Sequence, residues 1–285
     1  MDKIILIGGS GFIGKGLQKK LSGTELTLIG GRNLMELSAF QLSKKFEDQD
    51  IIINLAGQSI FGYWTKAYKR KLWNSRVDLT NRIYEALKLA KKKPKRFLTA
   101  SAIGLYDDGG VHDENSERFA DNDLSKLVQN WEKASDEIKK TGIDVTFLRI
   151  GIVMGKGGGT YKKLRLLTRL NLGAYFGKGN QSMSFIYYHD LLRAIVFVID
   201  KNINGVVNMV APGFTNNKEL MLSLKKKLNS FVLWRIPAFI IKVFMGEASI
   251  ILLEGQKVSP AVLQKHGFNF EAQNIEELLE KVESS

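Results

Sequence analysis

Short apolar runs alternate with amphipathic stretches through the first half of the chain. Residues 4–7 and 51–55 are almost wholly apolar over the length of a strand, whereas apolar side chains in 79–92 recur at the spacing of one helix face. Strands that are apolar on both faces and separated by helices predict a parallel sheet with helices on both sides, which is the doubly wound α/β class. The pattern predicts strands at 4–7, 26–29, 51–55, 96–100 and 145–150, and helices at 14–21, 79–92 and 124–140.

The first predicted strand leads directly into the turn GGSGFIG at residues 8–14. Glycine has no Cβ, so such a backbone can turn sharply, and a phosphate can approach the amides that open the next helix. The spacing is G-x-x-G-x-x-G rather than the commoner G-x-G-x-x-G. Its place between a strand and a helix predicts a Rossmann-type dinucleotide site; the alternative is a glycine-rich turn without a ligand.

The pattern loosens after Gly155, and residues 32–50 are too few for a full helix and strand. We therefore expect one position of the sheet to be abbreviated. The later predicted elements are a flexible loop at 156–159, a basic helix at 161–172, a glycine loop at 173–179, a strand near Phe185, a helix from Asp190 and a strand at 205–210. The expected division is a dinucleotide-binding domain at 1–155, with 190–211 completing its sheet, and a smaller, mostly helical C-terminal substrate region at 156–189 and 212–285.

Composition narrows the class of protein. A chain of 285 residues that is 44% hydrophobic can build the core of one large or two modest domains. It has no cysteine and only three scattered histidines, so neither a disulfide nor a metal site is predicted. We expect a cytoplasmic location, because a strand rather than a cleavable apolar leader opens the sequence. The apolar stretch 231–253 is interrupted by charged residues and a proline, and predicts buried or lid-forming helices rather than a membrane span.

The formal net charge of +13 is compatible with nucleic acid, an anionic membrane or a phosphorylated ligand as partner. The lysines are dispersed in short clusters on predicted helices, at 91–93, 162–163 and 225–227, without interleaved aromatic residues. We interpret them as a solvated surface. The expected partner is a small-molecule substrate, with neither nucleic acid nor membrane, and the oligomeric state is open.

Several motifs occur in a familiar order along nearly the whole chain. They are GGSGFIG (8–14), NLAG (54–57), SRVDLT (75–80), TASAIGLY (99–106), WEKA (131–134), LRIGIVMG (148–155) and GQKVSPAVLQKHGFNF (255–270). Together they resemble the epimerase-like branch of the atypical short-chain dehydrogenase/reductases, often labelled nucleoside-diphosphate-sugar epimerases, which carries a C-terminal domain of unknown function. The resemblance implies a Rossmann-type fold and dinucleotide binding more than it implies a particular reaction.

The resemblance assigns cofactor-binding residues on the first three strands. Arg32 follows the second strand, where an NAD-preferring protein usually has an acidic residue, and a guanidinium there favours the 2′-phosphate of NADP(H). The alternative for Arg32 is a solvated arginine of a turn. The residues implied to contact NADP(H), through backbone amides, close approach or packing, are Gly8, Ser10, Gly11, Phe12, Ile13, Gly14, Arg32, Leu55, Ala56, Gly57 and Ser101.

Catalytic residues are harder to assign. Ser101 aligns with the serine or threonine that hydrogen-bonds the reacting oxygen in this superfamily, and Tyr106 follows on the same loop. Most of these enzymes also carry Tyr-x-x-x-Lys on the helix predicted at 124–140, where the pair transfers a proton. An alignment on WEKA puts Leu124 and Val128 at those positions, and an alternative alignment puts Asn122 and Lys126 there. Neither supplies a tyrosine.

Three residues match positions near the implied substrate cleft, namely Arg76, Phe185 and Tyr187. Arg76 is suited to an anionic group, although it could instead pair with Asp78 or solvent. Two hypotheses follow. The first is an NADP(H)-dependent oxidoreductase or epimerase-like isomerase that acts on a small carbonyl or alcohol, with sugar- or nucleotide-linked molecules among the candidates. The second is a non-catalytic NADP(H)-sensing module. Nucleic-acid binding is a distant third.

Overall fold

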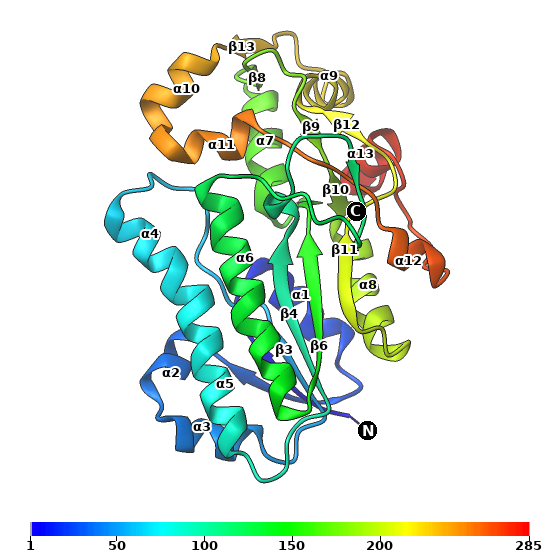
Figure 1. Ribbon diagram of the computed structural model, residues 1–285. Helices are drawn as coiled ribbons and strands as arrows, with labels where there is room; N and C mark the ends of the chain where they lie inside the picture. Colours follow the sequence, from blue (N-terminus) through cyan, green and yellow to red (C-terminus); the bar gives the residue numbers. More distant parts are fainter. Residues whose placement is uncertain (1, 285) are drawn as a thin grey trace.

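The computed structural model describes residues 2–284 and has a six-stranded parallel sheet at its centre (Figure 1). The strand order is β11-β6-β4-β3-β1-β2, and the register pairs Ile4 of β1 with Ile51 of β3. The strands are β1 (Lys3–Ile7), β2 (Glu25–Ile29), β3 (Ile51–Asn54), β4 (Arg96–Ala102), β6 (Asp144–Ile150) and β11 (Gly205–Met209). The predicted doubly wound α/β class is confirmed, and β11 completes the sheet by pairing with β6.

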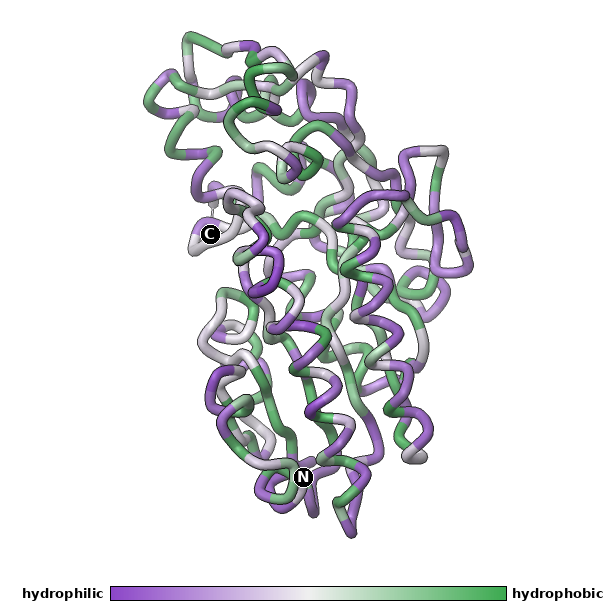
Figure 2. The backbone as a smooth tube through the Cα atoms, turned by 60° about the vertical axis from the view of Figure 1, so that its left-hand side comes forward, coloured by the Kyte–Doolittle hydropathy of each residue, from purple (hydrophilic) through white to green (hydrophobic). Residues whose placement is uncertain are grey.

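Helices cover both faces of this sheet. One face packs on α1 (Phe12–Lys20) and α8 (Tyr188–Asp200) through Leu17 and Ile195. The other face packs on α2 (Gly31–Glu36), α3 (Ala39–Phe46) and α5 (Leu79–Leu89), with α6 (Asp123–Asp136) beside them. Figure 2 shows hydrophobic and hydrophilic residues alternating along these helices, as expected where one side of a helix is buried. As predicted, 32–50 contain no strand; the chain passes through α2 and α3 directly to β3.

Local side chains fix where several helices begin. Ser38 accepts a hydrogen bond from the amide of Gln41, whose side chain returns one to the Ser38 amide, so α3 starts with a capping box. The side chain of Asn122 accepts the amide of Ser125 at the start of α6. Gly11 precedes α1, which begins two residues before the predicted Gly14.

A C-terminal lobe lies over the carboxyl ends of the central strands (Figure 1). Its helices are α7 (Gly159–Arg169), α9 (Asn217–Lys227), α10 (Ala238–Met245), α11 (Ile250–Leu253), α12 (Ala261–Lys265) and α13 (Ile275–Ser284), with a 3-10 turn η4 (Gly246–Ser249). Four two-stranded sheets pair β7 (Ile152–Gly155) with β10 (Phe185–Tyr187), β8 (Ala174–Phe176) with β13 (Trp234–Ile236), β9 (Ser182–Met183) with β12 (Thr215–Asn216), and β5 (Val111–His112) with β14 (Lys257–Val258). Of these strands only β10, near Phe185, was predicted from the sequence. The domain boundaries at 155, 189 and 211 stay a prediction.

The apolar segment 231–253 differs from its prediction. It forms β13, α10, η4 and α11 rather than helices alone, and α10 is not buried, because Phe239, Val243 and Phe244 expose two thirds or more of their surfaces. Within residues 2–284, none of the helices combines the length and the apolar character that crossing a bilayer requires.

Asp190 in the first turn of α8 ties the lobe to the sheet layer. Its fully buried carboxylate accepts the backbone amides of Glu271 and Ala272 at 3.0 Å and pairs with Arg193 at 2.8 Å. The Asp190→Ala substitution leaves those two amides without an acceptor, and we expect it to lower the free energy of unfolding by about 2–3 kcal/mol in urea titrations. Asp200→Ala, at the exposed end of the same helix, is the matched control. A loss no larger than that of the control would show that Asp190 does not anchor residues 271–272.

Candidate functional site

The turn between β1 and α1 is built so tightly that side chains are excluded at two of its glycines. Gly8 has a φ of +86°, and a Cβ there would lie 2.8 Å from the amide nitrogen of Ala56. A Cβ on Gly14 would lie 2.4 Å from the carbonyl oxygen of Gly8. Ser10 and Gly11 are exposed at the start of α1, and the Gly11 amide donates to the Gly8 carbonyl at 3.1 Å, which closes the turn. This cradle suits the pyrophosphate of a dinucleotide.

Phe12 holds the turn against the first residue of α8 and the loop before α7. Its ring stacks on Tyr188 with a centroid separation of 4.3 Å, and the Tyr188 hydroxyl donates to the Phe12 carbonyl at 3.1 Å. A Cβ on Gly158 would lie 2.7 Å from the same ring. The side chain of Phe12 is therefore engaged by the protein itself, and Ile13 packs on the core beside α8. Phe12 and Ile13 can therefore contact a ligand through their backbone amides rather than their side chains.

The remaining predicted cofactor residues surround the same edge of the sheet. Arg32 is the second residue of α2, is exposed, and forms no ion pair or hydrogen bond with the residues that the structure describes. Leu55 continues the β3 ladder through its amide, which donates to the Ile7 carbonyl at 2.9 Å. Ala56 is buried against Gly31, and Gly57 is exposed. Within the described chain, Arg32 is thus without a protein partner three residues after Ile29 of β2, whose carbonyl accepts the Gly8 amide at 3.2 Å, and its guanidinium is available to a phosphate.

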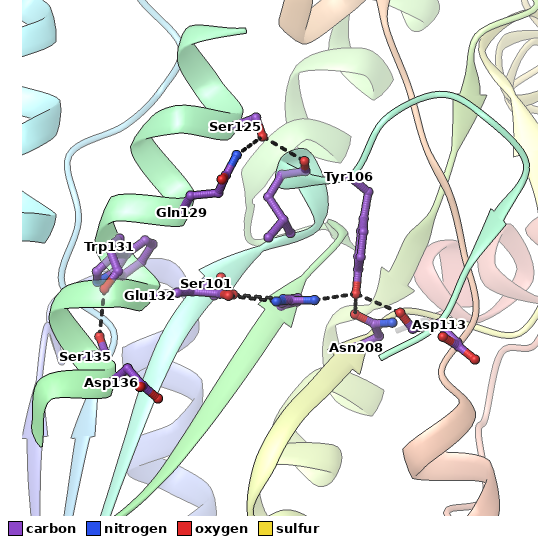
Figure 3. Close-up of polar contacts among 12 residues, drawn as sticks. Ser101, Tyr106, Asp113, Ser125, Gln129, Trp131, Glu132, Ser135, Asp136 and Asn208 are labelled. Carbon is purple, nitrogen blue, oxygen red and sulfur yellow. Dashed lines mark hydrogen bonds and ion pairs between the residues drawn. The ribbon is translucent and has the colours of Figure 1, made fainter. Parts of the chain in front are cut away.

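Ser101, at the end of β4, belongs to a buried hydrogen-bond network (Figure 3). Its hydroxyl donates to Glu132 of α6 at 2.5 Å, and Arg149 of β6 binds both oxygens of Glu132 at 2.8 and 2.7 Å. Although burial opposes it, the hydrogen bonds and the charge of Glu132 raise the pKa of Arg149. Arg149 and Glu132 are therefore a bidentate ion pair that fixes the position of the Ser101 hydroxyl.

The same network holds Tyr106. Its hydroxyl accepts a hydrogen bond from Arg149 at 2.7 Å and lies 3.0 Å from the Asp113 carbonyl and 3.1 Å from Oδ1 of Asn208. The ring is completely buried and stacks on His112. Burial raises the pKa of the Tyr106 phenol, so it stays neutral near pH 7. In this arrangement Tyr106 positions Arg149, and its predicted role as an acid or base would require it to leave these partners.

Sequence reasoning missed Glu132, Arg149 and Asn208, the other polar members of this network. A signal was available for Arg149, because a guanidinium inside an otherwise apolar strand has to find a partner. Glu132 stands within WEKA on the helix that packs beside that strand. A hollow of about 360 Å³ adjoins Glu132, between α6 and Phe119.

The structure distinguishes the two alignments of α6. Val128 is buried with Ile103 and Tyr106, and Leu124 lies against Gly104, where a Cβ would be 2.9 Å from its side chain. Asn122 precedes the helix as its cap, and Lys126 is exposed and pairs with Asp121. Leu124 and Val128 therefore face the Ser101 loop, whereas Asn122 and Lys126 lie at the start and on the exposed side of α6. The apolar side chains of Leu124 and Val128 cannot transfer a proton.

The three predicted substrate residues do not lie together. Phe185 and Tyr187 are buried in the core of the C-terminal lobe with Tyr161 and Leu220, and Phe185 exposes none of its surface. A substrate contact by Phe185 would require the ring to leave that core. Arg76 instead lies beside Gly57, where a Cβ would be 3.2 Å from its guanidinium. Of the three, Arg76 is the residue at the edge of the sheet that carries the glycine turn.

Comparison with known proteins agrees with this geometry. The model of the NAD dependent epimerase/dehydratase family matches residues 4–210. The chain belongs to this family. Residues 236–282 match a domain of unknown function, DUF1731, so the predicted resemblance is confirmed in both parts.

Similar proteins span the whole chain. An epimerase family protein of Staphylococcus epidermidis is 28% identical over 294 residues, and one of Staphylococcus saprophyticus is 29% identical; each alignment covers 98% of this chain and at least 98% of the relative. The crystal structure of human epimerase family protein SDR39U1 (isoform 2) with NADPH has a TM-score of 0.87 at 26% identity and covers 99% of both chains. UDP-glucuronic acid 4-epimerase from Bacillus cereus, at 18% identity and a TM-score of 0.76, shares the fold.

Proposed function

We propose that this chain binds NADP(H) at the turn of residues 8–14 and uses it in oxidoreductase or epimerase-like chemistry on a small molecule. The observation that carries the proposal is the cradle itself, in which Gly8 and Gly14 leave no room for a Cβ while Ser10 and Gly11 face solvent. The similar human protein SDR39U1 was crystallised with NADPH. When bound, the nicotinamide supplies or accepts a hydride.

The residues of the chain divide the remaining work. The backbone amides of Ser10, Phe12 and Ile13 would hold the pyrophosphate at the start of α1, and Leu55 to Gly57 would lie along the adenosine. Ser101 would hydrogen-bond the reacting oxygen. Glu132, fixed by Arg149, would take up or return the proton of that hydroxyl, since it already accepts it at 2.5 Å. This pair would act where Leu124 and Val128 have replaced the usual proton-transfer residues.

A non-catalytic NADP(H)-sensing module is the second candidate, and the apolar pair Leu124 and Val128 favours it. Two measurements distinguish these functions. Calorimetry with NADPH and with NADH tests the binding, and oxidation of NADPH with a panel of carbonyl compounds then tests the turnover. Absence of binding to either pyridine nucleotide would refute both candidates, whereas tight binding without turnover across the panel would favour the sensor.

Arg32 should decide which pyridine nucleotide binds. The Arg32→Glu substitution replaces the free guanidinium by a carboxylate that repels a 2′-phosphate, so we expect affinity for NADPH to fall at least tenfold. Affinity for NADH should change less than threefold, since a carboxylate accepts hydrogen bonds from a free ribose. Arg32→Lys keeps the charge but not the bidentate geometry, so its affinity for NADPH should fall less than that of Arg32→Glu. Calorimetry with both nucleotides measures the ratio, and an equal loss for both would contradict the assignment.

A further inference from the structure

Arg76 lies in an unusual piece of helix. The helix α4 (Lys66–Trp73) continues into α5 through a π-helical segment, η1 (Asn74–Asp78), with Arg76 at its centre. π-helical turns are rare because their hydrogen bonds are poorer than those of an α-helix, and they recur at functional sites. The wider turn places the guanidinium beside Gly57, at the carboxyl end of β3.

The Arg76 guanidinium has only neutral oxygens around it. It donates to the Gln58 carbonyl at 2.9 Å and, at the long limit, to the Ser75 hydroxyl at 3.4 Å and the Leu72 carbonyl at 3.5 Å. Within residues 2–284 no carboxylate lies within 4 Å of it; Asp78, the partner considered from the sequence, accepts the indole N–H of Trp73 instead. Burial lowers the pKa of Arg76 to about 10. A largely buried cation without a counter-charge is costly, and an incoming anion would offset that cost.

Trp131 of α6 packs against the Arg76 guanidinium. The guanidinium carbon of Arg76 lies 5.2 Å from the centre of its ring. The indole N–H of Trp131 is buried and has no acceptor in the described part of the chain. The ring face of Trp131 thus covers one side of the Arg76 cation and supplies no negative charge, so a counter-anion for Arg76 would have to come from a ligand.

The side chains that pack around Trp131 are mostly apolar. Trp131 belongs to a cluster that joins the sheet edge, α6 and the C-terminal lobe. Its partly exposed members are Leu55, Ile60, Tyr68, Leu124, Ile150, Met245, Ile250 and Ile251. The hydroxyls of a sugar would find few partners among these side chains, whereas an alkyl or aromatic body would bury its surface against them.

We propose that Arg76 binds the carboxylate or phosphate of a substrate whose remaining part is apolar. The inference rests on the proposed function, because it places this substrate at the edge of the sheet that carries the glycine turn. It differs from the ligand class seen in structures that share only the fold, such as the UDP-glucuronic acid in the Bacillus cereus epimerase.

Calorimetry with four probes tests the proposal, in the absence and presence of NADP⁺. The probes are octanoate, octyl phosphate, 1-octanol and UDP-glucose. We expect one or both octyl anions to bind the wild-type protein at least tenfold more tightly than octanol or UDP-glucose. Arg76→Met should weaken that binding at least tenfold and leave NADPH affinity within twofold. Arg70→Met, an exposed arginine of α4, is the matched control and should change neither.

Folding of the variants is checked by thermal unfolding. Arg76→Met removes a buried charge that lacks a partner and should be at least as stable as the wild type. Arg76→Lys provides a second measurement, since it retains the charge without the two-pronged geometry and should bind the octyl anions three- to tenfold more weakly.

Three results would overturn the inference. The first is octyl-anion binding that Arg76→Met does not weaken, and the second is tighter binding of UDP-glucose than of both octyl anions. The third is a tenfold loss of NADPH affinity in Arg76→Met, which would assign Arg76 to a phosphate of the cofactor. Failure of the wild type to bind NADPH would instead refute the proposed function, and the titrations without NADP⁺ would still report on Arg76.

Discussion

The Gly11→Asp variant is expected to lose NADPH binding by more than 100-fold while remaining folded. Gly11 precedes α1 with extended backbone, and a Cβ there would meet its nearest neighbour at 3.4 Å, an ordinary contact. Aspartate is also a favourable residue before a helix, so the fold should tolerate it. Its carboxylate would, however, take the amides meant for the pyrophosphate. At an effective dielectric constant near 20, each close pair of negative charges costs roughly 4 kcal/mol, and about 1.4 kcal/mol is a factor of ten.

The Gly11→Asn variant separates the effect of charge from that of shape. Asparagine has nearly the shape of aspartate and also caps a helix, but it carries no charge. Its loss of NADPH affinity should therefore be at least tenfold smaller than that of Gly11→Asp. Calorimetry measures NADPH binding, and circular dichroism confirms the fold of each variant. Equal affinities of Gly11→Asp and the wild type would show that the pyrophosphate does not lie at the start of α1.

The Arg149→Met variant should lose about 3–5 kcal/mol of its free energy of unfolding. Glu132 would then be left with its charge beside β6 and without the cation that binds both of its oxygens. Tyr106 would lose the donor to its hydroxyl at the same time. Urea denaturation measures the effect, as a lower midpoint with an unchanged slope.

The double variant Glu132→Met/Arg149→Met is the informative partner. It removes both charges and should recover more than half of the lost stability, because the cost in the single variant comes from an uncompensated carboxylate. A single variant that loses less than 1 kcal/mol would mean that Glu132 reaches solvent and that the pair does not hold the network together.

The central sheet was predictable because its strands are buried on both faces. Residues 4–7, 51–55 and 145–150 have nowhere to lie but inside a layered fold, and the glycine turn marks its ligand-binding edge. Apart from the strand at Phe185, the short paired strands outside the central sheet were not predicted, because runs of two to four residues show no clear periodicity. Segment 231–253 was predicted as buried or lid-forming helices; the buried alternative is wrong for α10, since local apolarity does not tell whether another element covers it.

Less of the site could be predicted than of the fold. The cradle at 8–14 is encoded locally, in seven consecutive residues. The ion pair of Glu132 and Arg149 arises only when α6 packs beside β6, and no spacing rule connects a helix residue to a strand residue seventeen positions later. Arg76 was predicted as a substrate residue, but the π-helical turn that carries it, and its lack of a carboxylate partner, have no signature in the sequence.

The place of β11 in the sheet constrains how the protein can be made. Strand β11 (Gly205–Met209) follows α7 and α8 in the chain. More than two hundred residues must therefore be synthesised before β6 can pair with β11, its second neighbour in the sheet. Until then β6 presents a row of unpaired backbone groups, the kind of open edge that recruits strands from other molecules. Newly synthesised chains thus carry this open edge from the completion of β6 until β11 pairs with it, and a fragment that stops at Gly155 would keep it permanently.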